Sequence, residues 1–95
     1  MNEEPKPGKQ RRQRAVALRY DQQRDAAPRV TAKGSGYIAE RIIELGKAHG
    51  IQVHEDPDLV AVLAKLDLEA HIPESLYRAV AEVLAFVYRL NHRRM

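Results

Sequence analysis

Residues 27–56 read APRVTAKGSGYIAERIIELGKAHGIQVHED, and this stretch decides the predicted fold. The stretch 29–32 is short, contains two β-branched residues and lies between a proline and a glycine, which predicts a strand. Over residues 37–49 apolar side chains recur at helical spacing with charged residues between them, so an amphipathic helix that buries one stripe is expected. Residues 51–54 alternate apolar and polar side chains, which predicts another strand. A strand, a crossover helix and a second strand together make a βαβ unit.

One strand is predicted before this unit and two helices after it. Residues 15–20 place Val16, Leu18 and Tyr20 on one face, which is typical of a half-buried strand. A short helix is expected after Asp56-Pro57, and a longer helix is expected to begin at Pro73. The predicted fold is therefore a small single-domain α/β sandwich. Its three- to four-stranded mixed sheet is built on one βαβ unit and packed with about three helices.

The composition excludes several classes of protein. A chain of 95 residues has room for one modest core, and 44% apolar residues suit a globular domain. The absence of cysteine excludes disulfides and thiol chemistry. No run approaches the roughly 18 apolar residues of a membrane span, and the polar start does not resemble a signal peptide. A cytoplasmic location with no membrane span is the expectation.

The positive charge is concentrated at the beginning of the chain. Residues 1–33 carry nine Lys/Arg against four Asp/Glu, whereas residues 34–95 carry seven against nine. We predict a disordered basic arm over residues 1–13, a folded domain over 14–91 and a basic tail over 92–95. The cations Arg11, Arg12 and Arg14 mark this arm. It is either a solvated tail or a binding element for nucleic acid, for an anionic membrane surface or for an acidic protein partner. Nucleic-acid binding by such an arm would be unspecific and salt-sensitive. No aromatic residue interleaves with it, so nucleic acid is not the expected partner.

The glycine turn also fits a nucleotide-binding pattern. Gly34-Ser35-Gly36 and Ala39 satisfy G-x-G-x-x-A between a predicted strand and helix, and the acidic pair at 55–56 follows about twenty residues later. Against this reading, the preceding strand has charged ends, and a dinucleotide crevice needs a larger sheet than one βαβ unit supplies. A nucleotide-binding module therefore stays an alternative, and no cofactor is expected.

Neither the histidines nor the serines form a recognisable reactive group. The spacings of His49, His54, His71 and His92 include no i, i+4 pair, so no metal site is predicted. Ser35 lies in G-S-G rather than in a nucleophile elbow, and no base or acid stands beside it in the sequence. No catalytic residue is proposed.

Several segments together resemble one known family. They are RAVALRYD at 14–21, APRVTAKGSGYIAERI at 27–42, the acidic turn before Pro57, and IPESLYRAVAEVLAFVYRLN at 72–91. These segments are similar to the cytoplasmic domain of the type III export-apparatus switch proteins, the FlhB/YscU family. The resemblance extends over residues 14–91, almost the whole predicted domain.

The resemblance also shows where the chain departs from the family. In the full-length proteins a membrane segment precedes this domain, and an N-P-T-H turn between the first two strands cleaves itself. Here the residues before the first strand, 10–13, read QRRQ. The chain is therefore expected to be a stand-alone, truncated form without self-cleavage. The family's preceding strand would be missing, leaving an open edge along residues 14–20 that either charge or an extended segment of a partner covers.

The function that the resemblance implies is docking. The family engages rod and hook export substrates at the export gate and takes part in switching substrate specificity. The resemblance points to a small apolar patch made of Ala27, Pro28, Ala81 and Leu84, although Ala81 and Leu84 also fit an ordinary core. We therefore expect a monomeric, non-enzymatic interaction module in the bacterial cytoplasm. Its expected partners are proteins of the flagellar or type III export gate and their substrates.

Overall fold

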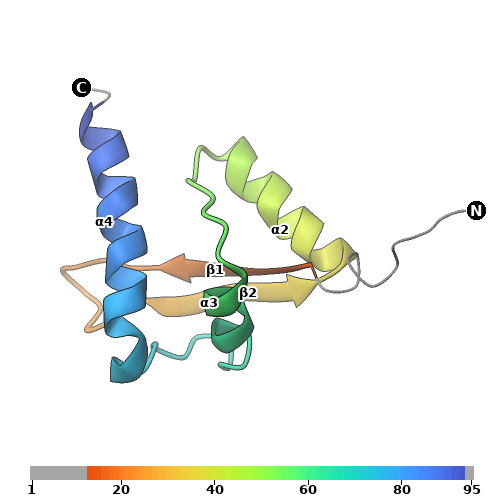
Figure 1. The fold of residues 1–95 in the computed structure, drawn as a ribbon, viewed down its shortest axis with the longest axis horizontal. Helices are drawn as coiled ribbons and strands as arrows, with labels where there is room; N and C mark the ends of the chain where they lie inside the picture. Colours follow the sequence, from red (N-terminus) through yellow and green to blue (C-terminus); the bar gives the residue numbers. More distant parts are fainter. Residues whose placement is uncertain (1–12, 94–95) are drawn as a thin grey trace, which may run out of the picture.

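The computed structural model describes the backbone of residues 13–93 and the side chains of residues 13–85. Arg11 and Arg12, like the side chains of the predicted tail, lie outside the described residues, and the predicted domain boundaries stay predictions. The elements in chain order are β1 (Arg14–Arg19), β2 (Arg29–Ser35), α2 (Tyr37–Ala48), α3 (Pro57–Leu63), the 3-10 turn η1 (Glu74–Leu76) and α4 (Tyr77–Arg93). Figure 1 shows α4 crossing one end of the two strands and α2 rising from the other end.

The sheet consists of β1 and β2, paired antiparallel. Ala17 lies opposite Ala32 but Leu18 lies opposite Val30, so Thr31 is an extra residue in β2. Such a bulge bends the strand and increases its twist. The Thr31 hydroxyl donates to the carbonyl oxygen of Ala17 at 3.3 Å, which ties the bulge to β1.

The predicted second half of the βαβ unit is wrong. Residues 51–56 run from α2 to α3 without forming a strand, so within the described residues the sheet has two antiparallel strands rather than three or four mixed ones. The alternating side chains that suggested a strand face solvent, since Ile51 is 63% and Val53 41% exposed. Alternation of apolar and polar side chains over only four residues is a weak signal of a strand. Here neither of the described strands pairs with residues 51–54.

The outer edge of β2 is instead covered by the segment 69–72, which lies between α3 and η1. Val30 N–H donates to Ala70 O at 3.0 Å, and Val30 O accepts from Glu69 N–H at 2.7 Å. Pro28 O accepts from Ile72 N–H at 2.9 Å. These three bonds occupy the edge that a third strand would need.

The α/β class and the three helices are confirmed, and their ends follow the predicted capping chemistry. The N-cap of α3 is Asp56, whose Oδ1 accepts from Leu59 N–H at 3.1 Å. At the end of α2, Gly50 takes a φ of +74°, the left-handed conformation expected of a residue that closes a helix. Pro73 is the extended N-cap of η1, one position earlier than the first-turn place predicted for it.

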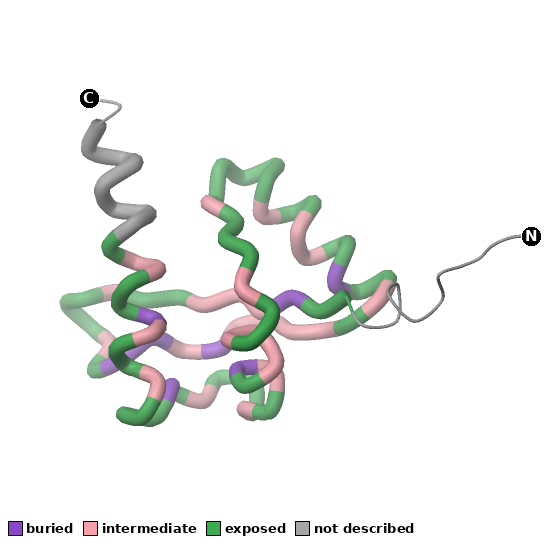
Figure 2. The backbone as a smooth tube through the Cα atoms, in the orientation of Figure 1, coloured by how far each residue is buried: buried purple, intermediate pink, exposed green. Residues whose placement is uncertain are grey.

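The core lies on the face of the sheet that α3 and α4 cover. Ala27, Leu63, Ile72 and Val80 form one buried cluster, and half-buried apolar side chains pack around it: Val16, Leu18, Leu59, Leu66, Leu76 and Leu84. In Figure 2 the buried positions gather around the strands, α3 and the first half of α4. Within the described residues, no helix is both long and apolar enough to span a membrane.

The helix α2 packs less completely than its sequence predicted. Among its residues only Ala39 is buried, and α2 contacts both strands. Two members of the predicted buried stripe, Ile38 and Leu45, are 53% and 49% exposed. For Leu45 the reason is geometric: α2 leaves the sheet at an angle, so the second half of the helix lies farther from the strands than the first half (Figure 1).

Candidate functional site

The four predicted docking residues come from two segments that meet at the core. Ala27 and Pro28 lead into β2, and Ala81 and Leu84 lie on α4. Ala27 and Val80 belong to the buried cluster, and Leu84 packs against that cluster. The fold therefore brings Ala27 and Leu84, 57 positions apart by their numbers, to the same part of the molecule.

Burial divides these residues into two layers. Ala27 is only 4% exposed and Pro28 is buried, so neither offers much surface to a partner. Ala81 is exposed and Leu84 half-buried, so a docked side chain would contact α4 first. The patch stays a prediction, with Ala81 and Leu84 as its accessible part and Ala27 and Pro28 beneath.

The structure adds one residue that sequence reasoning left out of the patch. Tyr77, 44% exposed, lies four positions before Ala81 and seven before Leu84. Residues at these spacings share one side of a helix. We define Tyr77, Ala81 and Leu84 as the α4 row. The same i, i+4, i+7 spacing was legible in the sequence, but it did not distinguish a half-exposed row from a core stripe.

The chain beneath this row is held in place from both sides. Pro28 O accepts from Ile72 N–H, as described above, so the proline carbonyl is fixed against the segment before α4. The guanidinium of Arg29 lies 3.5 Å from the Asp25 carboxylate through Nε and 3.4 Å from the Glu69 carboxylate through its NH1 group. These contacts join the 25–29 turn to the segment 69–72. A docked side chain would therefore meet a preorganised surface rather than a loose loop.

The glycine turn is explained by packing and backbone conformation. A Cβ on Gly34 would lie 2.7 Å from Ile38 Cβ, so only glycine lets β2 approach the first turn of α2 this closely. Gly36, the N-cap of α2, has a φ of +57°. Ala39 is fully buried between α2 and the strands. The two glycines and the alanine of the G-x-G-x-x-A pattern thus each have a structural role that needs no nucleotide.

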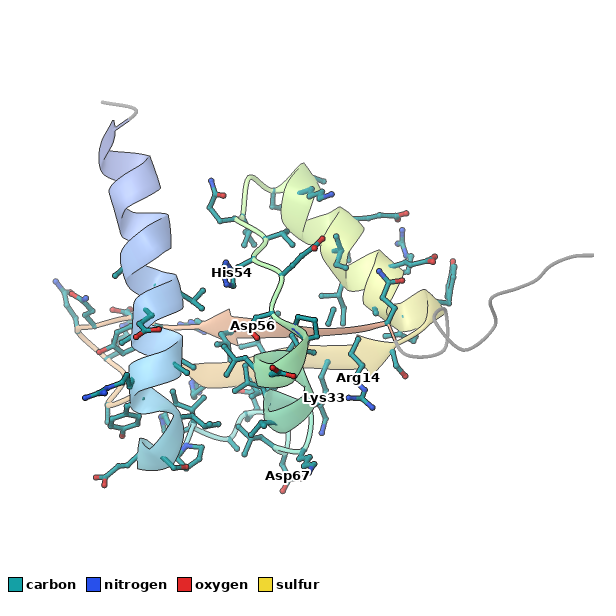
Figure 3. All side chains as sticks on the ribbon, viewed as in Figure 1. Arg14, Lys33, His54, Asp56 and Asp67 are labelled. Carbon is teal, nitrogen blue, oxygen red and sulfur yellow. The ribbon has the colours of Figure 1, made fainter. Side chains whose placement is uncertain are left out.

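The charged groups near this turn are also engaged. Lys33 Nζ donates to Leu66 O at 2.6 Å and to Ala64 O at 3.1 Å, at the C-terminal end of α3. Asp56, the acid that the nucleotide pattern would place on a ribose, caps α3 instead. Figure 3 shows Arg14 and Lys33 beside α3. A shallow hollow of about 260 Å³ there is lined by Arg14, Lys33, Gly34, Ser35 and Ala64.

Of the three arginines that mark the predicted basic arm, Arg14 is described by the structure. It is the first residue of β1 and is exposed. Its relation to Arg11 and Arg12 stays a prediction. Across the described residues, no three His, Asp or Glu side chains gather where they could hold a metal ion. His49 Nδ1 lies 2.9 Å from Leu45 O, at the end of its own helix.

The comparisons with known proteins agree with one another. The model of the FlhB HrpN YscU SpaS family matches residues 12–87. The chain is 46% identical over 78 residues to YlqH of Bacillus subtilis, covering 82% of this chain and 84% of that protein. It is 51% identical over 78 residues to the flagellar biosynthetic protein FlhB of Yersinia enterocolitica, covering 81% of this chain but 20% of that one. The chain thus spans about a fifth of the length of this FlhB.

Solved structures give the same result for the fold. The cytoplasmic domain of FlhB from Shewanella putrefaciens has a TM-score of 0.81 and 40% identity, covering 86% of this chain and 64% of that one. The PscU C-terminal domain has a TM-score of 0.74 and 30% identity, covering 79% and 96%. The described part of the chain therefore has the same fold as these two domains.

Proposed function

Since the chain belongs to the FlhB, HrpN, YscU and SpaS family, we propose that it is a non-enzymatic interaction module of a bacterial flagellar or type III export apparatus. In this proposal it works in the cytoplasm at the export gate. There it binds export substrates or gate proteins and contributes to the switch in substrate specificity. The family's self-cleavage is not part of the proposal, because QRRQ at residues 10–13 precedes β1 where the family carries N-P-T-H.

The proposal rests on the α4 row, which lies above the 25–29 turn that the Arg29 contacts hold in place. Tyr77 and Ala81 are exposed, Leu84 is half-exposed, and Ala27 and Pro28 lie in the layer beneath. A small side chain between two larger apolar ones leaves room for one apolar side chain of an extended peptide. Small apolar sites of this kind suit brief, repeated binding of many substrates, because each contact contributes little free energy.

The test is binding of purified rod and hook export substrates to the full chain, measured by calorimetry. Ala81→Asp places a charge in the middle of the α4 row, so binding should weaken by tenfold or more, about 1.4 kcal/mol. Ala48→Asp makes the same change at an exposed position of α2 and is the matched control. Equal binding by both variants, or no binding of any gate or substrate protein to the unmodified chain, would contradict the proposal.

A further inference from the structure

The connection between β1 and β2 contains a buried carboxylate to which the proposed function assigns no role. The side chain of Asp25 is only 9% exposed, although the residues on either side of it, Arg24 and Ala26, are exposed. Burying a carboxylate is costly unless hydrogen bonds and an opposite charge compensate it. The groups that compensate Asp25 are therefore the groups that this side chain holds together.

Reciprocal hydrogen bonds close the turn that contains Asp25. Its Oδ2 accepts from Asp21 N–H at 3.0 Å, and Asp21 Oδ1 accepts from Gln23 N–H at 3.0 Å. The carbonyl oxygen of Asp21 accepts from Arg24 N–H at 2.9 Å and from Asp25 N–H at 2.7 Å. Side chains that bond forward and backward in this way resemble a capping box, which fixes one turn of the chain. Residues 21–25 thus form one closed turn.

The same carboxylate also reaches β2. Asp25 Oδ1 lies 3.5 Å from Arg29 Nε, which is buried and has no hydrogen-bond partner among the described residues. Arg29 directs its NH1 group to Glu69 and its Nε to Asp25. One carboxylate therefore joins the closed turn to the first residue of β2.

The closed turn lies beside the predicted docking patch. Two positions after Asp25, Ala27 belongs to the same buried cluster as Val80 of α4, and Leu84 of the α4 row packs against that cluster. Figure 1 shows α4 crossing the strands at the end where the connection between β1 and β2 lies. The position of the closed turn therefore decides what a docked chain meets next to the α4 row.

We propose that Asp25 is a positioning residue of the docking surface. Its carboxylate holds Asp21 N–H and Arg29 together, and it acts through these two groups rather than by touching the partner. Exposed Ala26 and buried Ala27 are thereby kept in one arrangement before a partner arrives. Binding then avoids the free-energy cost of ordering this turn. The inference rests on the proposed function, because it gives Asp25 a part in docking at the α4 row.

The first experiment is amide hydrogen exchange of the free full chain. Asp25→Ala removes both contacts of the carboxylate. The amides of Asp21 and Arg24 should then exchange about tenfold faster, because the closed turn opens locally. The amide of Val30, which donates to Ala70 O at 3.0 Å, should change much less, because it exchanges only when the segment 69–72 leaves β2.

The second experiment is calorimetry of the full chain with purified rod and hook export substrates, at a temperature where every variant is folded. Asp25→Ala should weaken binding about fivefold, with the loss in the binding entropy, because the turn must then be ordered on binding. Asp25→Asn keeps an oxygen for Asp21 N–H and should weaken binding about twofold. Asp67→Ala and Asp67→Asn make the same changes at an exposed position and should leave binding unaltered.

This comparison separates positioning from stability. A purely structural role of Asp25 would lower the free energy of unfolding but would leave the dissociation constant of the folded chain unchanged. The weaker binding and its entropic origin are therefore the results that a structural role does not produce.

Three results would overturn the inference. The first is an unchanged exchange rate of the Asp21 amide in Asp25→Ala, and the second is equal acceleration at Val30. The third is faster exchange in the turn together with unaltered substrate binding. If the unmodified chain binds no export substrate, the proposed function fails and the docking role of Asp25 fails with it. The exchange experiment distinguishes that case, because it needs no partner.

Discussion

Single residues in this chain act mainly by what they allow the backbone to do. Gly34 lets the end of β2 contact Ile38, and Gly36 supplies a positive φ before α2. Glu69, the described non-glycine residue with positive φ, holds +70° while its N–H bonds to Val30. The glycines were legible in the sequence as a turn. The conformation of Glu69 was not, because nothing local in a glutamate favours the left-handed region.

Gly34 gives the sharpest residue-scale prediction. In Gly34→Ala the new Cβ would collide with the Cβ and Cγ2 of Ile38, so β2 and α2 must separate. We expect a loss of about 1–3 kcal/mol in the free energy of unfolding, measured with urea. Gly46→Ala is the matched control within α2, since its nearest side-chain atom is Ile51 Cβ at 3.9 Å. There the free energy of unfolding should stay level or rise by about 0.5–1 kcal/mol. Equal losses in both variants would contradict the packing account.

At the scale of elements, the three helices and the two strands were predictable, and the segment that covers the outer edge of β2 was not. Caps such as Asp56 and Gly50 are local chemistry, so helix ends can be predicted from neighbouring residues. Sheet pairing is settled by competition between distant segments. Residues 51–54 alternate as a strand should, yet residues 69–72, with no β pattern, take the free edge of β2. Main-chain pairing needs no particular side chains, so the sequence could not identify this partner.

Lys33 joins two elements and provides the prediction at this scale. Its ammonium donates to the carbonyl oxygen of Ala64, the C-cap of α3, and to that of Leu66, two residues farther on. Lys33→Met keeps the length of the side chain and removes both bonds. The free energy of unfolding should fall by about 1–3 kcal/mol. Lys47→Met on the exposed end of α2 is the control and should change it by less than about 0.5 kcal/mol. A Lys33 variant as stable as its control would show that these bonds do not hold α3 to β2.

For the whole molecule, the family and the α/β class could be predicted from the sequence, and the accessibility of the docking patch could not. In the sequence, the spacing of Ala81 and Leu84 fits both a core stripe and a surface row. In the structure, Leu84 packs on the buried cluster, whereas Ala81 is exposed. Ala27 lies within that cluster and lines the site only from beneath. Which side of a helix faces its neighbours depends on the packing of the whole chain.

The oligomeric state is the prediction for the whole molecule. With Arg14 and Arg19 in place, the full chain should sediment as a monomer across a wide range of concentration, because charged residues along an exposed strand discourage edge-to-edge pairing of two copies. The double variant Arg14→Leu and Arg19→Leu removes those charges and should self-associate as concentration rises. Arg24→Leu with Arg41→Leu removes the same charge elsewhere, at exposed positions, and should stay monomeric. A monomeric β1 double variant would contradict the role given to these arginines.

The covering of β2 by residues 69–72 also sets an order of assembly. The hairpin of β1 and β2 closes over a short loop, whereas the Arg29–Glu69 contact joins residues 40 positions apart. Distant contacts form more slowly because a longer chain must be brought together first. During synthesis, the first two strands must therefore wait for the segment before α4. A fragment that stops short of Glu69 would leave β2 bare on its outer side and open to pairing with other nascent chains.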